Sequence, residues 1–309
     1  MKHLVRLIPP FLVRMFARPY VAGDSLEKAL EVASRLHRDK GFLTTLDLLA
    51  EGVEDGVTAR RNIDTYLEMV DAAASDVRFP DRDSRPSLSL KLSSYTTDPL
   101  DKGGHADSSR EAVFEIAEYA KAKGVNLTLD MESRHWTEFT IELLGDLHRA
   151  GYRHVGAVLQ TRLHRTAADL ERIPEGMRVR LVIGIYDESK DHAITDKVEM
   201  KRRLVEYGAY LLKAGHYVEL ATHDEEWVRS FLEEIVPSVG ASTDHFEIQM
   251  LYGVPRDRLL SELHSQGCRV RLYVPFARSW PLAIAYLRRR LDEYPAMAFH
   301  VLRNLLRRA

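Results

Sequence analysis

Eight short apolar runs, separated by segments with helical periodicity, constrain the fold of this 309-residue chain more than any other feature. Many of the runs are rich in Val and Leu on both faces, as buried parallel strands are. They cover residues 42–50, 86–94, 125–133, 153–160, 178–186, 216–222, 245–251 and 268–274. Amphipathic segments such as 109–124 and 196–215 lie between them. Strands and helices that alternate in this way predict a (β/α)8 barrel of the TIM type.

The sequence contains no sign of a division into separate domains. Its length suits either two average domains or one barrel, and no linker or low-complexity segment is present. A doubly wound open sheet is the competing fold, but no G-x-G-x-x-G follows the first strand and the chain has no P-loop. Residues 25–39 predict a helix ahead of the barrel. We therefore expect one domain over residues 1–309, with a helical extension at 1–40 and the barrel at about 41–309.

Charge and cysteine content exclude several classes of function. Lys and Arg total 44 against 46 Asp and Glu, so a bulk attraction to nucleic acid is not implied and no nucleic-acid partner is expected. The single cysteine, Cys268, excludes an internal disulfide and a cysteine-based zinc or iron–sulfur site within one chain. No apolar stretch reaches the ~18 residues that a membrane-spanning helix needs. These features predict a cytoplasmic protein of enzyme size.

Both ends of the chain are apolar and basic. The N-terminal LVRLIPPFLVRMF is interrupted by prolines and arginines and has no small-residue cleavage site after it, so we interpret it as mature protein and not as a signal peptide. The C-terminal FHVLRNLLRRA is amphipathic, with Arg303, Arg307 and Arg308 among its polar residues. Such segments bind anionic membrane surfaces or pack as terminal helices on their own domain, and both readings stay open.

Polar residues gather where the predicted strands end, and in these barrels the active site lies at the carboxyl ends of the strands. A charged group inside a strand costs several kcal/mol, on the order of 3–5, if it is buried without a partner. We therefore expect Lys91, Asp130 and Arg180 to pair with one another or to face a ligand. The other polar residues at these positions are Glu132, Gln160, Tyr186, Thr222, His223, Asp224, Gln249 and Tyr273.

A helix predicted at 281–294 presents a further set of polar residues on one face. Tyr286, Arg289, Arg290 and Glu293 follow each other at spacings of i, i+3, i+4 and i+7. Two neighbouring guanidinium groups suit bidentate capture of a carboxylate or phosphate. The alternative is a solvated helix face with an Arg289–Glu293 ion pair.

Thr222 and Glu225 fit a capping box at the start of a helix over residues 224–235. The exposed amides of such a helix start favour anions. An ordinary helix cap is the alternative reading.

Hydrolytic chemistry has weaker support in the sequence. Asp130, Glu132 and His223 are candidate ligands for a divalent ion in a metal-dependent hydrolase or lyase. However, no H-x-H occurs on the first strand, no H-E-x-x-H occurs anywhere, and no G-x-S-x-G elbow indicates a serine nucleophile. We expect no bound metal.

The ordered set of strand-end motifs resembles the proline dehydrogenase family. The motifs are SLKLSS, LTLDMES, VGAVLQ, RVRLVIGIY, ELATHD, FEIQMLYG, VRLYVPF and YLRRRLDE. The resemblance runs from about Val21 to the C-terminus, and Y-x-x-R-R-x-x-E together with ATH and K-L-S makes it specific. Members of this family are flavin enzymes on a (β/α)8 barrel, usually with FAD.

The resemblance implies roles for the matched residues. Lys91, Arg289 and Arg290 correspond to a cationic cradle for an amino-acid carboxylate. Asp130 and Tyr273 correspond to a pair that orders the substrate pocket, and Arg180 to an arginine near flavin N5. Residues implied to lie against the substrate ring are Tyr286, Leu251 and Ile185. Residues implied to contact or support the flavin are Met131, Gln160, Ile183, Gly184, Ile185, Thr222, His223 and Glu293.

The implied reaction is hydride transfer from the carbon next to nitrogen of L-proline, or of a related imino or amino acid, to FAD. The product from proline is 1-pyrroline-5-carboxylate, and the electrons pass to a membrane quinone, which gives the basic ends a purpose at the inner face of the membrane.

The chain departs from the family pattern at four positions. Ile183 replaces a Lys, Ile185 an Ala, Tyr294 an Asn and Ala277 a Gly. A different cyclic amino acid, or a flavin-binding member that does not act on proline, therefore stays open.

Overall fold

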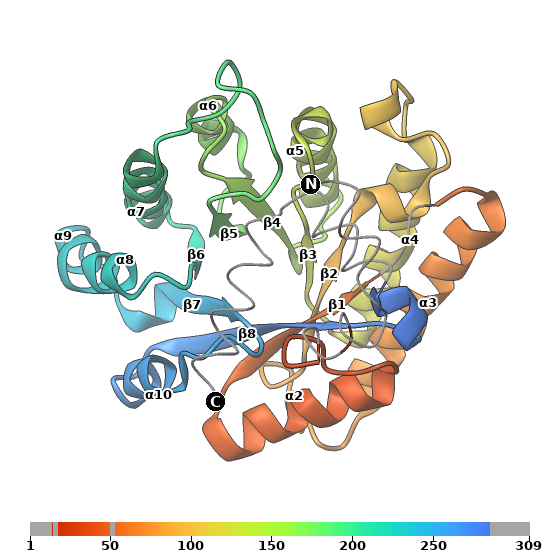
Figure 1. Cartoon of the computed structure of the whole chain (residues 1–309), viewed down its shortest axis with the longest axis horizontal. Helices are drawn as coiled ribbons and strands as arrows, with labels where there is room; N and C mark the ends of the chain where they lie inside the picture. The colour runs from red at the N-terminus through yellow and green to blue at the C-terminus, as the bar shows by residue number, and fades with distance from the viewer. Residues whose placement is uncertain (1–13, 15–17, 50–52, 285–309) are drawn as a thin grey trace.

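Eight parallel strands close into a barrel in the order in which they occur along the chain, as Figure 1 shows. The computed structural model describes residue 14 and residues 18–49 and 53–284. The strands are β1 (Leu43–Leu48), β2 (Ser87–Leu90), β3 (Leu127–Leu129), β4 (Val155–Gln160), β5 (Arg178–Val182), β6 (Tyr217–Ala221), β7 (Phe246–Leu251) and β8 (Arg269–Phe276). Each lies within or overlaps one predicted run, and β8 pairs with β1 to close the barrel. The TIM-type fold is confirmed, and an open sheet is excluded.

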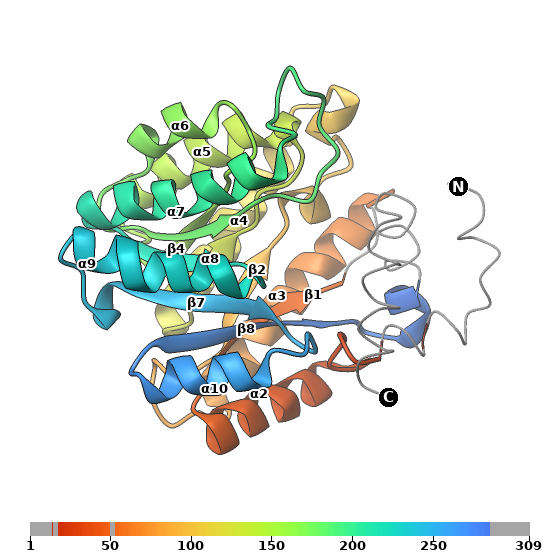
Figure 2. The ribbon, with the colours of Figure 1, turned by 60° about the vertical axis from the view of Figure 1, so that its left-hand side comes forward.

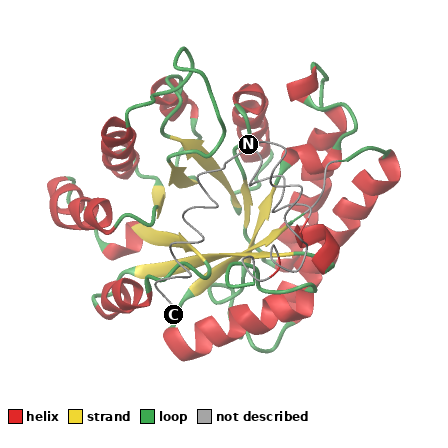
Figure 3. Cartoon of the chain, viewed as in Figure 1, coloured by secondary structure: helices red, strands yellow, loops and turns green. Residues whose placement is uncertain are grey.

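Helices surround the barrel, as expected from the amphipathic segments between the strands (Figure 3). The α-helices are α2 (Leu26–Lys40), α3 (Gly56–Ser75), α4 (Asp107–Lys123), α5 (Arg134–Arg149), α6 (Thr166–Asp169), α7 (Lys197–Lys213), α8 (Glu225–Ser230), α9 (Val236–Ser238) and α10 (Asp257–Ser265). The shorter turns are η2 (Leu92–Tyr95), η3 (Leu100–Lys102), η4 (Leu170–Arg172), η5 (Phe231–Ile235) and η6 (Thr243–His245). None of the helices in the described part of the chain has the length and apolarity needed to span a membrane.

The helix predicted ahead of the first strand is confirmed as α2. The Ser25 side chain accepts a hydrogen bond from the backbone of Lys28 at its start, and Gly41, at φ 69°, ends it. Helix α2 lies beside α10 on the outside of the barrel and packs against β1 and β8 (Figure 2). It therefore covers the seam where the last strand meets the first.

Three strands end four residues before their predicted runs do. Strand β2 ends at Leu90 and leads into η2, β3 ends at Leu129, and β5 ends at Val182. At β5 the cause is Gly184, whose φ of 104° takes the backbone out of the extended conformation. Lys91, Asp130 and the segment 183–186 therefore begin the loops at the barrel mouth.

The barrel interior is polar. The outward faces of the strands carry buried Leu, Ile and Val that pack beneath the helices, whereas the inward positions of β5–β8 carry charged groups. Arg271 donates to both oxygens of Glu247, at 2.6 and 3.1 Å, and to the carbonyl oxygen of Thr44. Both side chains are more than nine-tenths buried. A buried charge is tolerated only when it is paired, so each of these partners depends on the other.

We predict that Arg271→Met destabilises the protein by about 3–5 kcal/mol, because it leaves Glu247 buried without its cation. A matched control is Arg229→Met, since Arg229 also pairs with glutamates, Glu225 and Glu262, but at the surface. That change should shift the urea midpoint far less, because exposed ion pairs contribute little to stability. Urea unfolding followed by circular dichroism measures both. Equal midpoints for the two variants would contradict the role given to the interior pair.

Candidate active site

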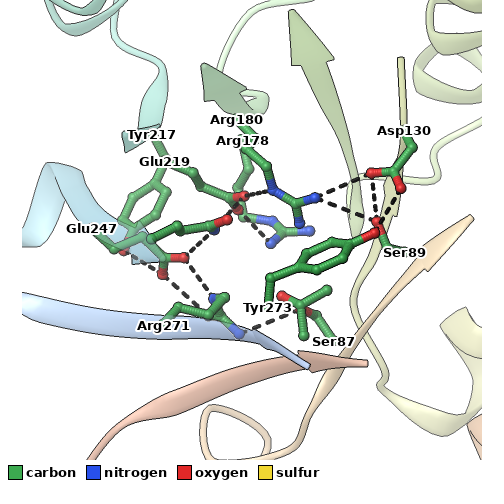
Figure 4. Close-up of polar contacts among 12 residues, drawn as sticks. Ser87, Ser89, Asp130, Arg178, Arg180, Tyr217, Glu219, Glu247, Arg271 and Tyr273 are labelled. Carbon is green, nitrogen blue, oxygen red and sulfur yellow. Dashed lines mark hydrogen bonds and ion pairs between the residues drawn. The ribbon is translucent and has the colours of Figure 1, made fainter. Parts of the chain in front are cut away.

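Asp130, directly after β3, is the centre of a cluster at the carboxyl ends of the strands. Its Oδ1 accepts hydrogen bonds from Ser89 Oγ at 2.6 Å and from Arg180 Nη1 at 3.1 Å. Its Oδ2 accepts one from the hydroxyl of Tyr273 at 2.8 Å and lies 3.5 Å from Lys91 Nζ. Figure 4 shows Arg180, Ser89 and Tyr273 converging on this carboxylate. One side chain thus binds groups from β2, β5 and β8.

The charges around Asp130 determine its protonation. Burial alone would raise its pKa, but the cations of Lys91 and Arg180 outweigh that effect and hold the pKa below the usual value. The pKa of Tyr273 is raised, chiefly by burial and then by the negative charge of Asp130. The site therefore contains an ionised carboxylate and a protonated phenol at neutral pH.

Asp47 is a member of this cluster that the sequence did not reveal. It lies near the end of β1, is 2% exposed and forms an ion pair with Lys91. Burial raises the pKa of Asp47 even though Lys91 opposes that effect. The one hint in the sequence was that Asp47 is the single charged residue of the predicted run 42–50. Lys91 is therefore shared between the buried Asp47 and the partly buried Asp130, which fixes where its ammonium group lies.

Gln160 and Gly184 bring polar groups together at the carboxyl ends of β4 and β5. Gln160 Nε2 donates to the carbonyl oxygen of Glu132 at 2.6 Å. A Cβ atom at Gly184 would overlap Gln160 Oε1, so the loop passes this close only because glycine stands there. Gln160 Oε1 and Arg180 Nη2 are buried and have no hydrogen-bond partner among the residues described. Such atoms mark a place where a polar ligand can complete the hydrogen bonds.

The ends of β6 and β7 are joined by His223. Its Nε2 accepts a hydrogen bond from the backbone N–H of Leu251 at 2.9 Å. Desolvation by neighbouring protein atoms and the charge of Arg256 lower the pKa of His223 to about 4, so the ring is neutral at pH 7 although the residue is exposed. The capping box predicted from Thr222 and Glu225 is not formed, so that prediction is wrong. Helix α8 begins at Glu225 with Asp224 as its N-cap, and Thr222 instead accepts the N–H of Asp224.

A cleft of about 580 Å³ opens beside this cluster, between the loops that follow β3 and β5. Glu132, which accepts hydrogen bonds from the Ser93 backbone and hydroxyl, lies in its wall. Other lining residues include His135, Trp136, Tyr186 and His192. The volume of the cleft is within the range of clefts that bind small molecules.

The predicted site residues that the structure describes lie at one end of the barrel. Met131 is buried after β3, Thr222 follows β6, Leu251 ends β7, and Ile183 and Ile185 follow β5, with Ile185 51% exposed. Tyr286, Arg289, Arg290, Glu293 and Tyr294 lie outside the described residues. Ala277 is fully buried, and its N–H donates to the carbonyl oxygen of Gly23.

The candidate metal ligands do not form a joint site. Asp130 is bound by cations, Glu132 by Ser93, and His223 by the backbone of Leu251. Across residues 18–49 and 53–284, no three side chains of His, Cys, Asp or Glu are grouped so that they could hold a metal ion.

Comparison with known proteins gives a consistent result. The family model described as Proline dehydrogenase matches residues 29–301. Proline dehydrogenase of Deinococcus radiodurans is 33% identical over 297 residues, which is 94% of this chain and 90% of the relative. Proline dehydrogenase 1 of Bacillus subtilis is 30% identical over 308 residues, covering 99% of this chain and 96% of the relative.

Solved structures with the same fold belong to longer proteins. Proline utilization A (PutA) from Bdellovibrio bacteriovorus, in a form inactivated by N-propargylglycine, superposes with a TM-score of 0.76 at 22% identity. A variant of PutA from Bradyrhizobium japonicum gives a TM-score of 0.71 at 22% identity. Each match covers 89% of this chain, but this chain spans only about a third of either PutA, 32% and 30%.

Proposed function

This chain belongs to the proline dehydrogenase family, and we propose that it oxidises L-proline to 1-pyrroline-5-carboxylate with FAD as the hydride acceptor. The observation that carries the proposal is the partly buried Asp130, held at the barrel mouth by Lys91, Arg180, Ser89 and Tyr273. Such a set of fixed charges suits a zwitterionic substrate, whose carboxylate and amine need partners of both signs.

The residues at the mouth fit a flavin. FAD, when bound, supplies the acceptor for a hydride, which amino-acid side chains cannot provide. We assign Gln160, Ile183, Gly184 and Arg180 to its binding, since Gln160 Oε1 and Arg180 Nη2 lack partners within the described chain and Gly184 allows close approach of a ligand to the backbone. Met131, Thr222, His223 and Ile185 lie on the neighbouring strand ends and complete the proposed contacts, with Glu293 from the C-terminal segment.

The substrate carboxylate is assigned to Lys91 together with Arg289 and Arg290. Asp130 holds Lys91 and Tyr273 in place and keeps the surroundings of the substrate amine negative. Leu251, Ile185 and Tyr286 are assigned to the apolar ring. In the reaction the carbon next to nitrogen loses a hydride and the nitrogen loses a proton, so that a C=N bond forms in the ring.

An anaerobic titration tests the function. We expect L-proline to bleach the visible absorption of the FAD-loaded protein and to release 1-pyrroline-5-carboxylate in equal amount. Flavin that stays oxidised would overturn L-proline as the substrate and direct attention to Ile183 and Ile185, where this chain is bulkier than its family. Failure of the protein to bind added FAD would overturn the cofactor assignment.

Asp130→Asn is expected to lower kcat/KM for L-proline by about 10²–10³-fold, because the neutral amide cannot hold Lys91, Arg180 and Tyr273 together. Asp244→Asn is the matched control, since Asp244 is an exposed carboxylate ahead of β7 at the opposite end of the barrel. Steady-state kinetics with an artificial electron acceptor measure both. An equal loss in the two variants would remove Asp130 from the reaction.

We propose a membrane quinone as the electron acceptor, reached by a cytoplasmic protein that binds peripherally at the inner face of the membrane. The basic C-terminal sequence supports this assignment. We expect the protein to float with anionic liposomes at low salt, and to do so less at high salt because salt screens surface charge. Replacing Arg303, Arg307 and Arg308 by Gln should abolish flotation. Equal flotation of the two proteins would exclude this segment as the contact.

A further inference from the structure

We infer that Glu219, on β6, is a positioning residue for Arg180. It holds the guanidinium group from inside the barrel, so that the orientation and the effective charge of Arg180 at the mouth depend on it. The inference rests on the proposed function, in which Arg180 lies next to the flavin. Glu219 is the first residue of the ELATHD motif, but neither the motif nor the resemblance assigned it a role.

Arg180 is fixed on three sides. Its Nη1 donates to Asp130 Oδ1 at 3.1 Å and to Ser89 Oγ at 3.3 Å. Its Nε lies 3.5 Å from Glu219 Oε2, and its guanidinium carbon stands 5.1 Å from the centre of the Tyr273 ring. Nη2 is buried and has no hydrogen-bond partner in the part of the chain described. Nε also makes no hydrogen bond there, but it has the ion-pair contact with Glu219, so Nη2 is the atom left for a ligand.

Glu219 is held in turn by two side chains of the barrel interior. It is 1% exposed, its Oε1 accepts from Arg178 Nη1 at 2.9 Å, and its Oε2 accepts from Gln249 Nε2 at 2.7 Å. Gln249 also donates to Glu247, the partner of Arg271. Figure 4 shows this network running from Arg271 through Glu247 and Glu219 to Arg180.

Strand pairing makes the Glu219–Arg180 contact part of the barrel itself. The two residues are register partners on β6 and β5, so their side chains start from neighbouring positions on the inner face. Both lie on strands and not on loops, and rigid elements place functional groups more accurately than loops do. Asp130 therefore contacts Arg180 from the barrel mouth, and Glu219 contacts it from the barrel interior.

Arg180 consequently faces two carboxylates, which together offset its positive charge. Removal of the Glu219 charge should leave Arg180 more strongly positive and less well oriented. A more positive surrounding stabilises the negative charge that a flavin gains on reduction, so the reduction equilibrium should move towards the reduced form.

The test compares Glu219→Gln with Glu247→Gln. Both carboxylates are 1% exposed and pair with an arginine, but Glu247 makes no hydrogen bond or ion pair with Arg180. Spectroelectrochemical titration of the FAD-loaded proteins should show the reduction equilibrium of Glu219→Gln shifted by about tenfold towards reduced flavin, about 30 mV for a two-electron couple. Glu247→Gln should shift it by less than about threefold, near 14 mV by the same relation. Equal shifts, or a shift in the opposite direction, would overturn the inference.

Crystal structures of the same variants without flavin separate this inference from the proposed function. In Glu219→Gln we expect the Arg180 guanidinium to leave its present position, and in Glu247→Gln to keep it. If the wild-type chain binds no FAD, the proposed function fails while these structures still decide the role of Glu219. An unmoved Arg180 in Glu219→Gln would refute the role.

If that variant does not fold, Gln249→Leu replaces it. This change removes the amide that holds Glu219 and keeps every charge. The same displacement of Arg180 is expected.

Discussion

The ion pair between Arg180 and Asp130 is the interaction on which the rest of the site depends. Asp130 would be expensive to bury alone, and so would Arg180. Together they are stable at the barrel mouth, where Ser89, Lys91 and Tyr273 satisfy the remaining positions around the carboxylate. Removing either charge takes away one of the two opposite charges that the other faces, since Asp130 also lies near Lys91 and Arg180 near Glu219.

This pair continues into the barrel as a series of two carboxylates joined by an amide, with an arginine at each end. Arg180 contacts Glu219, Gln249 joins Glu219 to Glu247, and Glu247 pairs with Arg271. Each carboxylate in this series lies beside a guanidinium, so each of these buried negative charges has a positive partner. The same network that stabilises the fold therefore reaches the mouth through Glu219, which contacts Arg180 directly.

Much of the architecture could be predicted from the sequence, because it depends on local pattern. Val- and Leu-rich runs between amphipathic segments specify strands and helices wherever they occur, and Ser25 and Gly41 mark the ends of α2 as their cap chemistry requires. Lys91, Asp130 and Arg180 were expected to pair because charges inside strands must do so, and they do. The ends of β2, β3 and β5 were placed too late, since apolar residues continue into the loops after them.

The sequence by itself determined the barrel, the family to which the chain belongs, and the end of the barrel at which the candidate site residues lie. Only the tertiary structure decided which charges meet. Asp47, Glu219 and Glu247 each stand inside an apolar run, where alternation alone cannot tell an inward carboxylate from one that faces outward. Barrel closure and strand register bring Asp47 to Lys91 and Glu219 to Arg180. The physical reason is that a strand specifies the direction of its side chains, whereas their partners come from neighbouring strands that are distant in the sequence.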